Sequence, residues 1–319
     1  MIAVIYIAYL FLNIGWIALH SRNAHKGNYP LEALCTASPS LSAYIINSPR
    51  GGNTLDFANP HAVKALNAAL LTYYYNLSFW DIPQNYLCPP VPGRADYIHY
   101  IADLLSDGQP SYIPKGKQVK GLDIGTGANL IYPIIAHAEY GWKMVGTDID
   151  RVSIKSANTI LGANPRFAKH IKVLFQNNEN SIFEGVVKPN DNYDFCMCNP
   201  PFHESAKQAL QSATRKTNNL ARNKLRRQSP VKNTSGKQLN FAGQANELWC
   251  KGGELAFITS IINESVQYAN QIKWFTSLVS KRENLPLLKK RLAIINATTI
   301  KQVDMTQGNK TSRFIAWQF

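Results

Sequence analysis

The chain has 319 residues, of which 45% are hydrophobic and 11% aromatic, so it can bury a large core, and intrinsic disorder is not expected. Its 34 Lys and Arg residues outnumber the 20 Asp and Glu residues and give a net charge of +14. A balance this basic favours a polyanionic partner, such as nucleic acid or an anionic membrane surface.

The five cysteines are scattered along the chain and include no C-x-x-C pair. This spacing argues against a zinc site and against a disulfide framework. We therefore expect no metal and a reducing, cytoplasmic setting. The cysteines are Cys35, Cys88, Cys196, Cys198 and Cys250.

Residues 1–19 form an uncharged, hydrophobic N-terminal extension. A membrane-spanning helix needs roughly 20 such residues, and the basic residues Arg22 and Lys26 that follow would keep the rest of the chain in the cytoplasm. Three interpretations stay open: a membrane tether, a hydrophobic helix that packs on the domain, and an upstream extension of the reading frame. The tether is the minority interpretation, because length alone supports it.

Residues 20–117 are expected to form a helical, loop-rich N-terminal region. The stretch from residue 21 to 60 is polar and rich in turn-forming residues, with one short helix predicted over 31–37. Apolar residues at helical spacing then predict a helix over 61–76.

Asn59 and Pro60 suit the cap and the first turn of that helix. After it, a proline-rich elbow leads into an amphipathic helix that extends from about Tyr97 to Leu105. Arg94 lies at the junction between the elbow and this helix.

From residue 118 to 319 strand-like and helix-like segments alternate, which predicts parallel strands with helices on both faces of the sheet. We expect the last two strands to form a hairpin, because the short GNKT turn between them leaves no room for a crossover helix. The predicted strands cover residues 119–125, 143–150, 171–176, 193–201, the start of 253–271, 272–280, 298–307 and 312–319. The predicted helices cover residues 128–141, 151–164, the remainder of 253–271 and 283–296.

The turn after the first of these strands reads D-x-G-x-G, with Asp123, Gly125 and Gly127. Glycine lets backbone N–H groups and a helix N-terminus approach a ligand closely. Asp148 ends the next strand, where a carboxylate can accept both hydroxyls of an adenosine ribose. Leu130 replaces the third glycine of the dinucleotide fingerprint and weakens a nicotinamide or flavin interpretation. S-adenosylmethionine needs only the turn and the ribose carboxylate, so we expect it to be the cofactor.

The strand at 193–198 runs into Asn199, two prolines and Phe202. Proline lacks an N–H and fixes φ, so the strand must end in a stiff loop. The side-chain oxygen of Asn199 and the carbonyl of Pro200 can accept the two hydrogens of a planar exocyclic amine, while Phe202 stacks on the ring. Methyl transfer from a sulfonium is an in-line displacement that chiefly demands placement. A simple strand-terminating turn is the alternative interpretation.

Residues 204–237 hold nine Lys or Arg residues and a single acid, Glu204, directly after this loop. Phosphate contacts from such residues give salt-dependent, sequence-independent affinity for nucleic acid. A solvated, partly disordered loop is the alternative, and both descriptions can hold. The candidate RNA-binding residues of this basic insert are Arg215, Lys216, Arg222, Lys224, Arg226 and Arg227.

A series of blocks, taken in order, resembles the ribosomal RNA large-subunit methyltransferase F family, to which the U6 small nuclear RNA adenosine methylase is related. The blocks are LDIGTGANLIYPI, GWKMVGTDID, CNPPFH, LNFAGQANELWCKGGE, WFTSLVSKRENLP and QGNKTSRFIAWQF. The resemblance extends from about His20 to Phe319, and the later blocks are peculiar to this group. It implies methylation of N6 of one adenine in 23S rRNA.

The same resemblance implies roles for individual residues. Arg94 corresponds to the residue that reaches the methionine carboxylate of the cofactor. Gly125 and Asn129 correspond to turn positions around the methionyl and ribose portions, and Asp148 to the ribose ligand. The loop from Gln176 to Ser181 resembles the wall on the adenine side, with Asn180 as its candidate contact.

We therefore predict an α/β class I S-adenosylmethionine-dependent methyltransferase over residues 118–319, with a Rossmann-like seven-stranded sheet whose last strand is antiparallel. The expected partner is 23S rRNA or a large-subunit assembly intermediate. Guanine-N2 methylation of rRNA stays open, because that amine satisfies the same acceptors; glutamine methylation of a protein is disfavoured by the basic insert. A noncatalytic RNA-binding or ribosome-assembly protein is the remaining alternative, and cofactor binding would discriminate against it.

Overall fold

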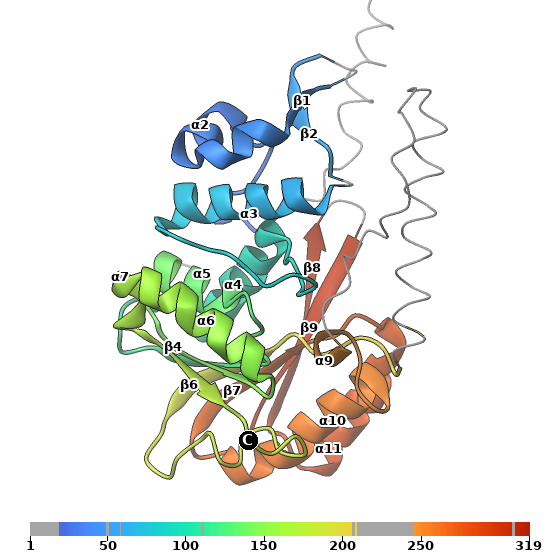
Figure 1. The fold of residues 1–319 in the computed structure, drawn as a ribbon. Helices are drawn as coiled ribbons and strands as arrows, with labels where there is room; N and C mark the ends of the chain where they lie inside the picture. Colours follow the sequence, from blue (N-terminus) through green and yellow to red (C-terminus); the bar gives the residue numbers. More distant parts are fainter. Residues whose placement is uncertain are drawn as a thin grey trace, which may run out of the picture.

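The computed structural model describes residues 19–48, 51–57, 59–109, 112–205, 208, 245–307 and 310–319. A seven-stranded sheet of order β5-β4-β3-β6-β7-β9-β8 forms the centre of the molecule, and a separate hairpin, β1-β2, lies in the N-terminal region (Figure 1). The strands are β1 (Ile45–Asn47), β2 (Asn53–Leu55), β3 (Lys120–Ile124), β4 (Lys143–Asp148), β5 (Ile171–Phe175), β6 (Tyr193–Cys198), β7 (Ile272–Leu278), β8 (Thr299–Gln307) and β9 (Lys310–Gln318).

The sheet confirms the predicted architecture. Strands β5, β4, β3, β6 and β7 are parallel to one another, whereas β9 runs antiparallel to both β7 and β8. In the central register Ile124 pairs with Thr147 of β4 and with Cys198 of β6. The loops that follow these three strands therefore leave the sheet side by side.

Two hydrophobic clusters cover the two faces of the sheet. One contains buried residues of α4, α5 and α6, such as Ile98 and Ile134, and the other contains those of α10 and α11, such as Ile261 and Leu288. The helices are α2 (Leu31–Ala37), η1 (Pro39–Tyr44), α3 (Pro60–Tyr75), α4 (Val91–Leu105), α5 (Ile131–Tyr140), α6 (Arg151–Ala163), α7 (Pro165–Ala168), α9 (Ala245–Leu248), α10 (Gly253–Ser265), η2 (Val266–Tyr268), η3 (Arg282–Asn284) and α11 (Leu285–Ile294).

The N-terminal region is helical, as predicted. Helix α2 covers the expected range, and α3 begins at Pro60 with Asn59 as its cap, because the backbone N–H of His61 donates to the Asn59 side chain at 3.0 Å. Helix α4 begins at Val91, earlier than the apolar spacing suggested. Arg94 therefore lies in the first turn of a helix and not before it.

The strand predicted at the start of residues 253–271 is wrong. This segment forms helix α10 and the short helix η2. Ile258, Ile261 and Ile262 are buried at helical spacing, and the carboxylate of Glu254 in the first turn accepts backbone hydrogen bonds from the loop after β7. The apolar run alone could not separate a buried helix from a buried strand.

No helix of the described ranges combines the length and the apolar character that crossing a bilayer requires. Residues 1–18, which hold nearly all of the apolar extension, lie outside the described residues.

A buried chain of hydrogen bonds joins α4 to the sheet. The hydroxyl of Tyr97 lies 2.7 Å from that of Thr276 in β7, which in turn donates to the backbone carbonyl of Cys196 in β6 at 2.9 Å. All three residues are fully buried. The chain fixes α4 against the strand that leads into the Asn199 loop.

Candidate active site

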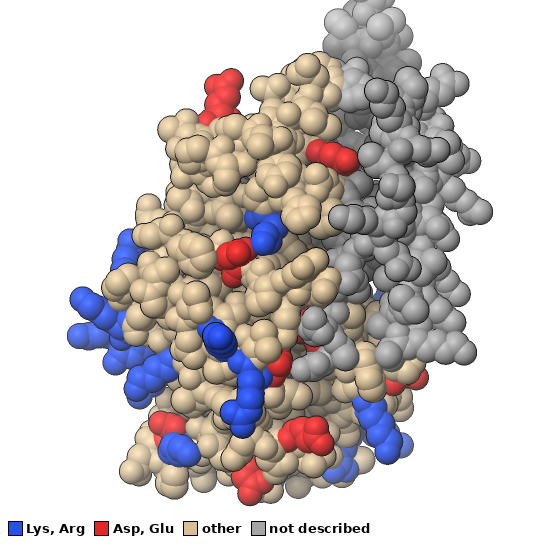
Figure 2. All heavy atoms as spheres, in the orientation of Figure 1, with Lys and Arg blue, Asp and Glu red and all other residues tan. Residues whose placement is uncertain are grey.

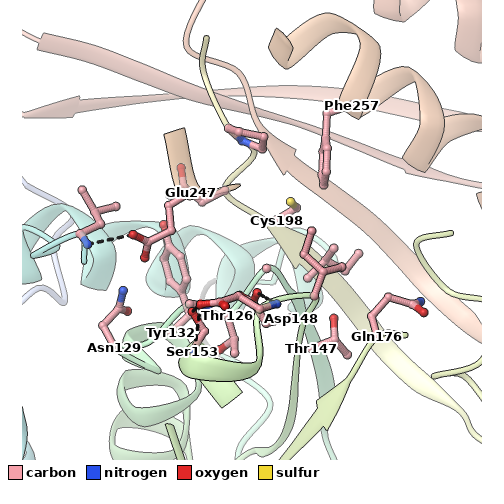
Figure 3. A pocket seen from close by; sticks show the side chains of 18 of the residues that line it. Thr126, Asn129, Tyr132, Thr147, Asp148, Ser153, Gln176, Cys198, Glu247 and Phe257 are labelled. Atoms are coloured by element: carbon pink, nitrogen blue, oxygen red, sulfur yellow. Dashed lines mark hydrogen bonds between the residues drawn. The ribbon is translucent and has the colours of Figure 1, made fainter. Parts of the chain in front are cut away.

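A cavity of about 130 Å³ opens at the carboxyl ends of the central strands. Its wall includes the last residues of β3, β4 and β6, which are Ile124, Asp148 and Cys198. Ligand sites of open α/β sheets occur at this edge. Other residues of the wall include Asn129, Tyr132, Gln176, Glu247 and Phe257 (Figure 3).

The glycine turn forms the floor of the cavity. Gly125 and Gly127 both line it and have φ values of 70° and 66°, in the left-handed region that side chains disfavour. A Cβ atom at Gly125 would meet nothing within 4 Å, so the space above it is open to a ligand. The backbone N–H of Gly127 donates to the Asp148 carboxylate at 2.9 Å.

Asp148 lines the cavity at the end of β4, where the sequence predicted a ligand carboxylate. It also accepts a hydrogen bond from the backbone N–H of Asp150 at 2.9 Å. Burial raises its pKa, and the two backbone hydrogen bonds act in the opposite direction. Asp150 also lines the cavity and caps α6 by accepting from Val152 and Ser153.

Asp123 lies beneath the cavity and not on its wall. It is fully buried, and neither carboxylate oxygen has a hydrogen-bond partner among the described residues. Burial raises its pKa to about 7, despite the nearby Thr126 hydroxyl, which opposes the rise. Asp123 is therefore a buried residue of β3 next to the glycine turn and is not among the residues that line the cavity.

The Asn199 loop leaves β6 at the rim of the cavity. Asn199 and Pro201 line it, and the Asn199 side-chain oxygen is buried without a hydrogen-bond partner among the described residues. Pro200 is buried and Phe202 half-buried, and neither is among the lining residues. The structure thus brings Asn199 together with the glycine turn and Asp148, and places Phe202 outside the cavity.

Arg94 and Asn129 line the cavity as the sequence predicted. Arg94 donates to the hydroxyl of Tyr132 at 2.7 Å and lies 5.4 Å from the centroid of its ring. Asn129 is held by Ile131, whose N–H donates to its side chain, and by the Trp80 indole, which donates to its backbone carbonyl. These contacts hold the side chains of Arg94 and Asn129 at the wall of the same cavity.

The loop from Gln176 to Ser181 reaches the cavity through residues other than the predicted one. Gln176, Glu179 and Ser181 are lining residues, whereas Asn180 is exposed and lines a neighbouring hollow that it shares with Trp249. The Gln176 side-chain amide donates to the backbone carbonyl of Glu184 at 2.9 Å and so folds the loop back on itself. Asn180 is therefore not among the residues that line the cavity.

Glu247 is a lining residue that the sequence analysis missed. It comes from α9, after the basic insert, and accepts a hydrogen bond from the backbone N–H of Leu87 at 3.0 Å (Figure 3). No local pattern marks it, because its two neighbours in the cavity, Leu87 and Gly127, lie far away in sequence. The acid in the block LNFAGQANELWCKGGE was its only signal.

The six candidate RNA-binding residues, Arg215, Lys216, Arg222, Lys224, Arg226 and Arg227, lie outside the described residues. The structure describes residues 203–205 before this segment and resumes at residue 245 after it. His203 and Trp249 form a parallel β-bridge, in which His203 donates to the carbonyl of Leu248 and accepts from the N–H of Cys250. Lys281 adds an ion pair with Glu204 at 3.4 Å. The described residues on either side of the insert therefore lie side by side, close to Glu247 on the wall of the cavity.

The described surface carries charges of both signs. In the view of Figure 2, Lys and Arg side chains gather over the edge formed by α6 and α7, and acidic side chains are spread singly. This edge therefore adds basic surface to the described part of the chain.

A family profile described as RNA methyltransferase matches residues 16–319. The chain belongs to this RNA methyltransferase family. Ribosomal RNA large subunit methyltransferase F of Psychromonas ingrahamii is 51% identical over 301 residues, which cover 94% of each chain. This likeness confirms the resemblance that the sequence blocks indicated.

Two human structures share the fold of this RNA methyltransferase. The human METTL16 catalytic domain in complex with the MAT2A 3'UTR hairpin 1 is 29% identical, with a TM-score of 0.76 and coverage of 95% of this chain and 96% of that one. The N-terminal domain of human METTL16 in complex with SAH is 27% identical, with a TM-score of 0.70 and coverage of 94% and 98%. The fold is that of a class I methyltransferase.

Proposed function

We propose that this enzyme transfers a methyl group from S-adenosylmethionine to N6 of an adenine in 23S rRNA. The observation that carries the proposal is the side-chain oxygen of Asn199, which lies buried at the cavity without a partner among the described residues. A buried acceptor left unpaired costs about 1–3 kcal/mol. An exocyclic amine supplies the missing donor, and the backbone carbonyl of Pro200 is the proposed acceptor of its second hydrogen.

The cavity fits S-adenosylmethionine, which supplies an electrophilic methyl group when bound. Asp148 presents a carboxylate suited to ribose hydroxyls above the glycine turn, and open space lies over Gly125. Arg94, with Asn129 nearby, offers a permanent cation for the cofactor carboxylate. Support also comes from the structure of a human relative in complex with SAH.

Two further cofactor assignments stay as proposals. Asp123 would support the turn from below, and its uncompensated burial suggests that a cationic ligand nearby would favour its charged form. Asn180 would approach the adenine only after the loop from Gln176 to Ser181 rearranges, since it lines the neighbouring hollow here.

Placement is the main catalytic contribution that these residues would make. Asn199 and Pro200 would orient the amine nitrogen, and Phe202 would stack on the base from the edge of the loop. The target adenine must lie in a single strand or be flipped out of a helix to reach this depth. No general base is required for an in-line methyl transfer from a sulfonium.

The ribosomal substrate is supported by the name of the relatives, ribosomal RNA large subunit methyltransferase F. A basic insert that begins at the rim of the cavity is consistent with phosphate contacts around the target. We infer that 23S rRNA or a large-subunit assembly intermediate is the substrate and that the enzyme works in the cytoplasm, where these RNAs are found.

The test is single-turnover methylation of a 23S rRNA fragment by the parent protein and by Asn199→Ala, followed by mass spectrometry of the nucleosides. We expect N6-methyladenosine from the parent and a rate at least about 100-fold lower from the variant, because an in-line reaction is then without the group that positions the amine. Melting temperature and cofactor affinity are expected to stay close to those of the parent.

Asn192→Ala is the matched control, since Asn192 is exposed and lies away from the cavity. It is expected to react at the parental rate. A folded Asn199→Ala protein that also reacts at the parental rate would reject the role of the loop. N2-methylguanosine in place of N6-methyladenosine would reassign the base, and a parent that binds no cofactor would indicate a noncatalytic RNA-binding protein.

A further inference from the structure

Glu247 places a carboxylate over the glycine turn. Its Oε2 atom accepts from the Leu87 N–H at 3.0 Å, and its Oε1 atom would lie 3.4 Å from a Cβ built on Gly127. The side chain of Asn129 lies equally near to that point. Figure 3 shows Glu247, Asn129 and Tyr132 toward one end of the cavity and Thr147 and Gln176 toward the other. The carboxylate therefore belongs to one defined end.

Arg94 belongs to the same end, because it donates to the hydroxyl of Tyr132. This end of the cavity thus offers a guanidinium and a carboxylate, each of which lines the wall. A ligand complementary to such a pair carries an anion and a cation close together. The amino acid end of S-adenosylmethionine does so, with an α-carboxylate and an α-ammonium on one carbon atom.

We propose that Glu247 is a cofactor-binding residue that accepts a hydrogen bond from the α-ammonium group, while Arg94 takes the α-carboxylate. The proposal rests on S-adenosylmethionine being the cofactor. Charge-assisted hydrogen bonds of this kind are about twice as strong as neutral ones. Glutamine at the same position would keep an acceptor for Leu87 but would lose the charge.

Glu247 also connects the cofactor with the basic insert. It lies in α9, between the end of the insert and the bridge that Trp249 makes with His203. A ligand that holds Glu247 in place therefore also holds α9, which lies directly before the bridge between Trp249 and His203.

The experiment is calorimetric titration of the parent and of Glu247→Gln with three ligands: S-adenosylmethionine, S-adenosylhomocysteine and 5'-methylthioadenosine. The first two carry the α-ammonium, and the third lacks the whole amino acid end. We expect about 10- to 100-fold weaker binding of the first two to the variant, the scale for losing a hydrogen bond to a charged group. The affinity for 5'-methylthioadenosine is expected to stay unchanged.

Glu32→Gln is the matched control, because it makes the same charge change at an exposed position of α2, away from the cavity. It is expected to bind all three ligands like the parent. Deaminated S-adenosylhomocysteine tests the same contact in the unaltered protein, so the proposal stays testable even if the variant folds poorly. Its affinity for the parent is expected to fall by a similar factor.

Three outcomes would overturn the proposal. Unchanged affinity of Glu247→Gln for all ligands would remove Glu247 from the cofactor site. Equal weakening of all three would indicate a structural role in closing the cavity. Weaker binding of S-adenosylmethionine alone would indicate that the Glu247 carboxylate contacts the sulfonium and not the α-ammonium group. A parent that binds the cofactor but methylates no adenine would contradict the proposed function while leaving this result intact.

Discussion

Asp123 is the residue whose burial conflicts most with its charge. Its carboxyl group is fully buried, and its pKa rises to about 7 because burial disfavours the ionised form. In the unfolded chain the same group titrates near its ordinary value of 3.8. At pH values between 3.8 and about 7, the Asp123 carboxyl group is protonated in the folded protein but ionised in the unfolded chain. This difference destabilises the folded protein as the pH rises through the window.

Asp123→Asn is therefore expected to raise the stability of the cofactor-free protein at pH 8 but not at pH 4. The pKa rise of roughly three units sets an upper scale of about 4 kcal/mol for the gain in the free energy of unfolding at pH 8. Urea unfolding at both pH values measures it. Asp107→Asn, at an exposed position, is the control and should change neither value by more than about 0.5 kcal/mol. An equal gain at both pH values would contradict the pKa assignment.

At this scale the sequence predicted the residues that local patterns define. The two turn glycines, Asp148 and Asn199 follow directly from strand ends, and all of them line the cavity, whereas Phe202 does not. Glu247 could not be found in this way, because it meets Leu87 across 160 positions of the chain. Asn180 was chosen from a loop whose direction depends on the hydrogen bonds of Gln176, which no local pattern reveals.

At the scale of elements, alternation predicted the sheet because each parallel strand and its helix leave a distinct period in the sequence. It failed at α10, where a short apolar run after two glycines fits either a strand or a helix. The hairpin β1-β2 was also missed, since its strands have three residues each and lie in a polar segment. Elements that depend on packing partners far away leave the weakest signal.

The basic insert is the element whose function is most open to test. The described residues that flank it are joined by the bridge between His203 and Trp249, so changes within it should not alter the cavity. Charge reversal at Arg226 and Arg227 is expected to weaken RNA binding. It should also lower the slope of log affinity against log salt by about 0.7–0.9 for each phosphate that the variant no longer neutralises. Filter binding at several salt concentrations measures both.

Charge reversal at Lys289 and Lys290 is the matched control, because these adjacent basic residues are exposed on α11. It should leave the RNA affinity and its salt slope near the parental values. Salt slopes that are equal for the insert variant and the parent would reject the insert as an RNA-binding element. Cofactor affinity should be unaffected in both variants.

At the scale of the whole molecule, the two hydrophobic clusters share one sheet and should unfold together. Phe195 and Cys196 are neighbours in β6, yet one packs in each cluster. Ile98→Ala on α4 and Ile261→Ala on α10, both at fully buried positions, are each expected to lower the free energy of unfolding by roughly 2–5 kcal/mol. For either variant, tryptophan fluorescence and circular dichroism should report the same midpoint in urea.

Ile294→Ala serves as the control, because this side chain of α11 is 59% exposed. Its effect is expected to stay within about 0.5 kcal/mol. Separate midpoints for the two probes in one variant would show that one layer of the molecule melts independently of the other.

The buried hydrogen bonds from Tyr97 through Thr276 to the carbonyl of Cys196 affect how precisely the cofactor and the target amine would be placed relative to each other. They connect α4, the helix that contains Arg94, to β6, the strand that leads into Asn199. Arg94, which would bind the cofactor, and Asn199, which would bind the amine that receives the methyl group, are therefore positioned by the same hydrogen bonds. A displacement of about 1 Å between reacting groups can slow such a reaction about 100-fold. The distance between the reacting atoms therefore depends on Tyr97 and Thr276, whose side chains would contact neither the cofactor nor the RNA.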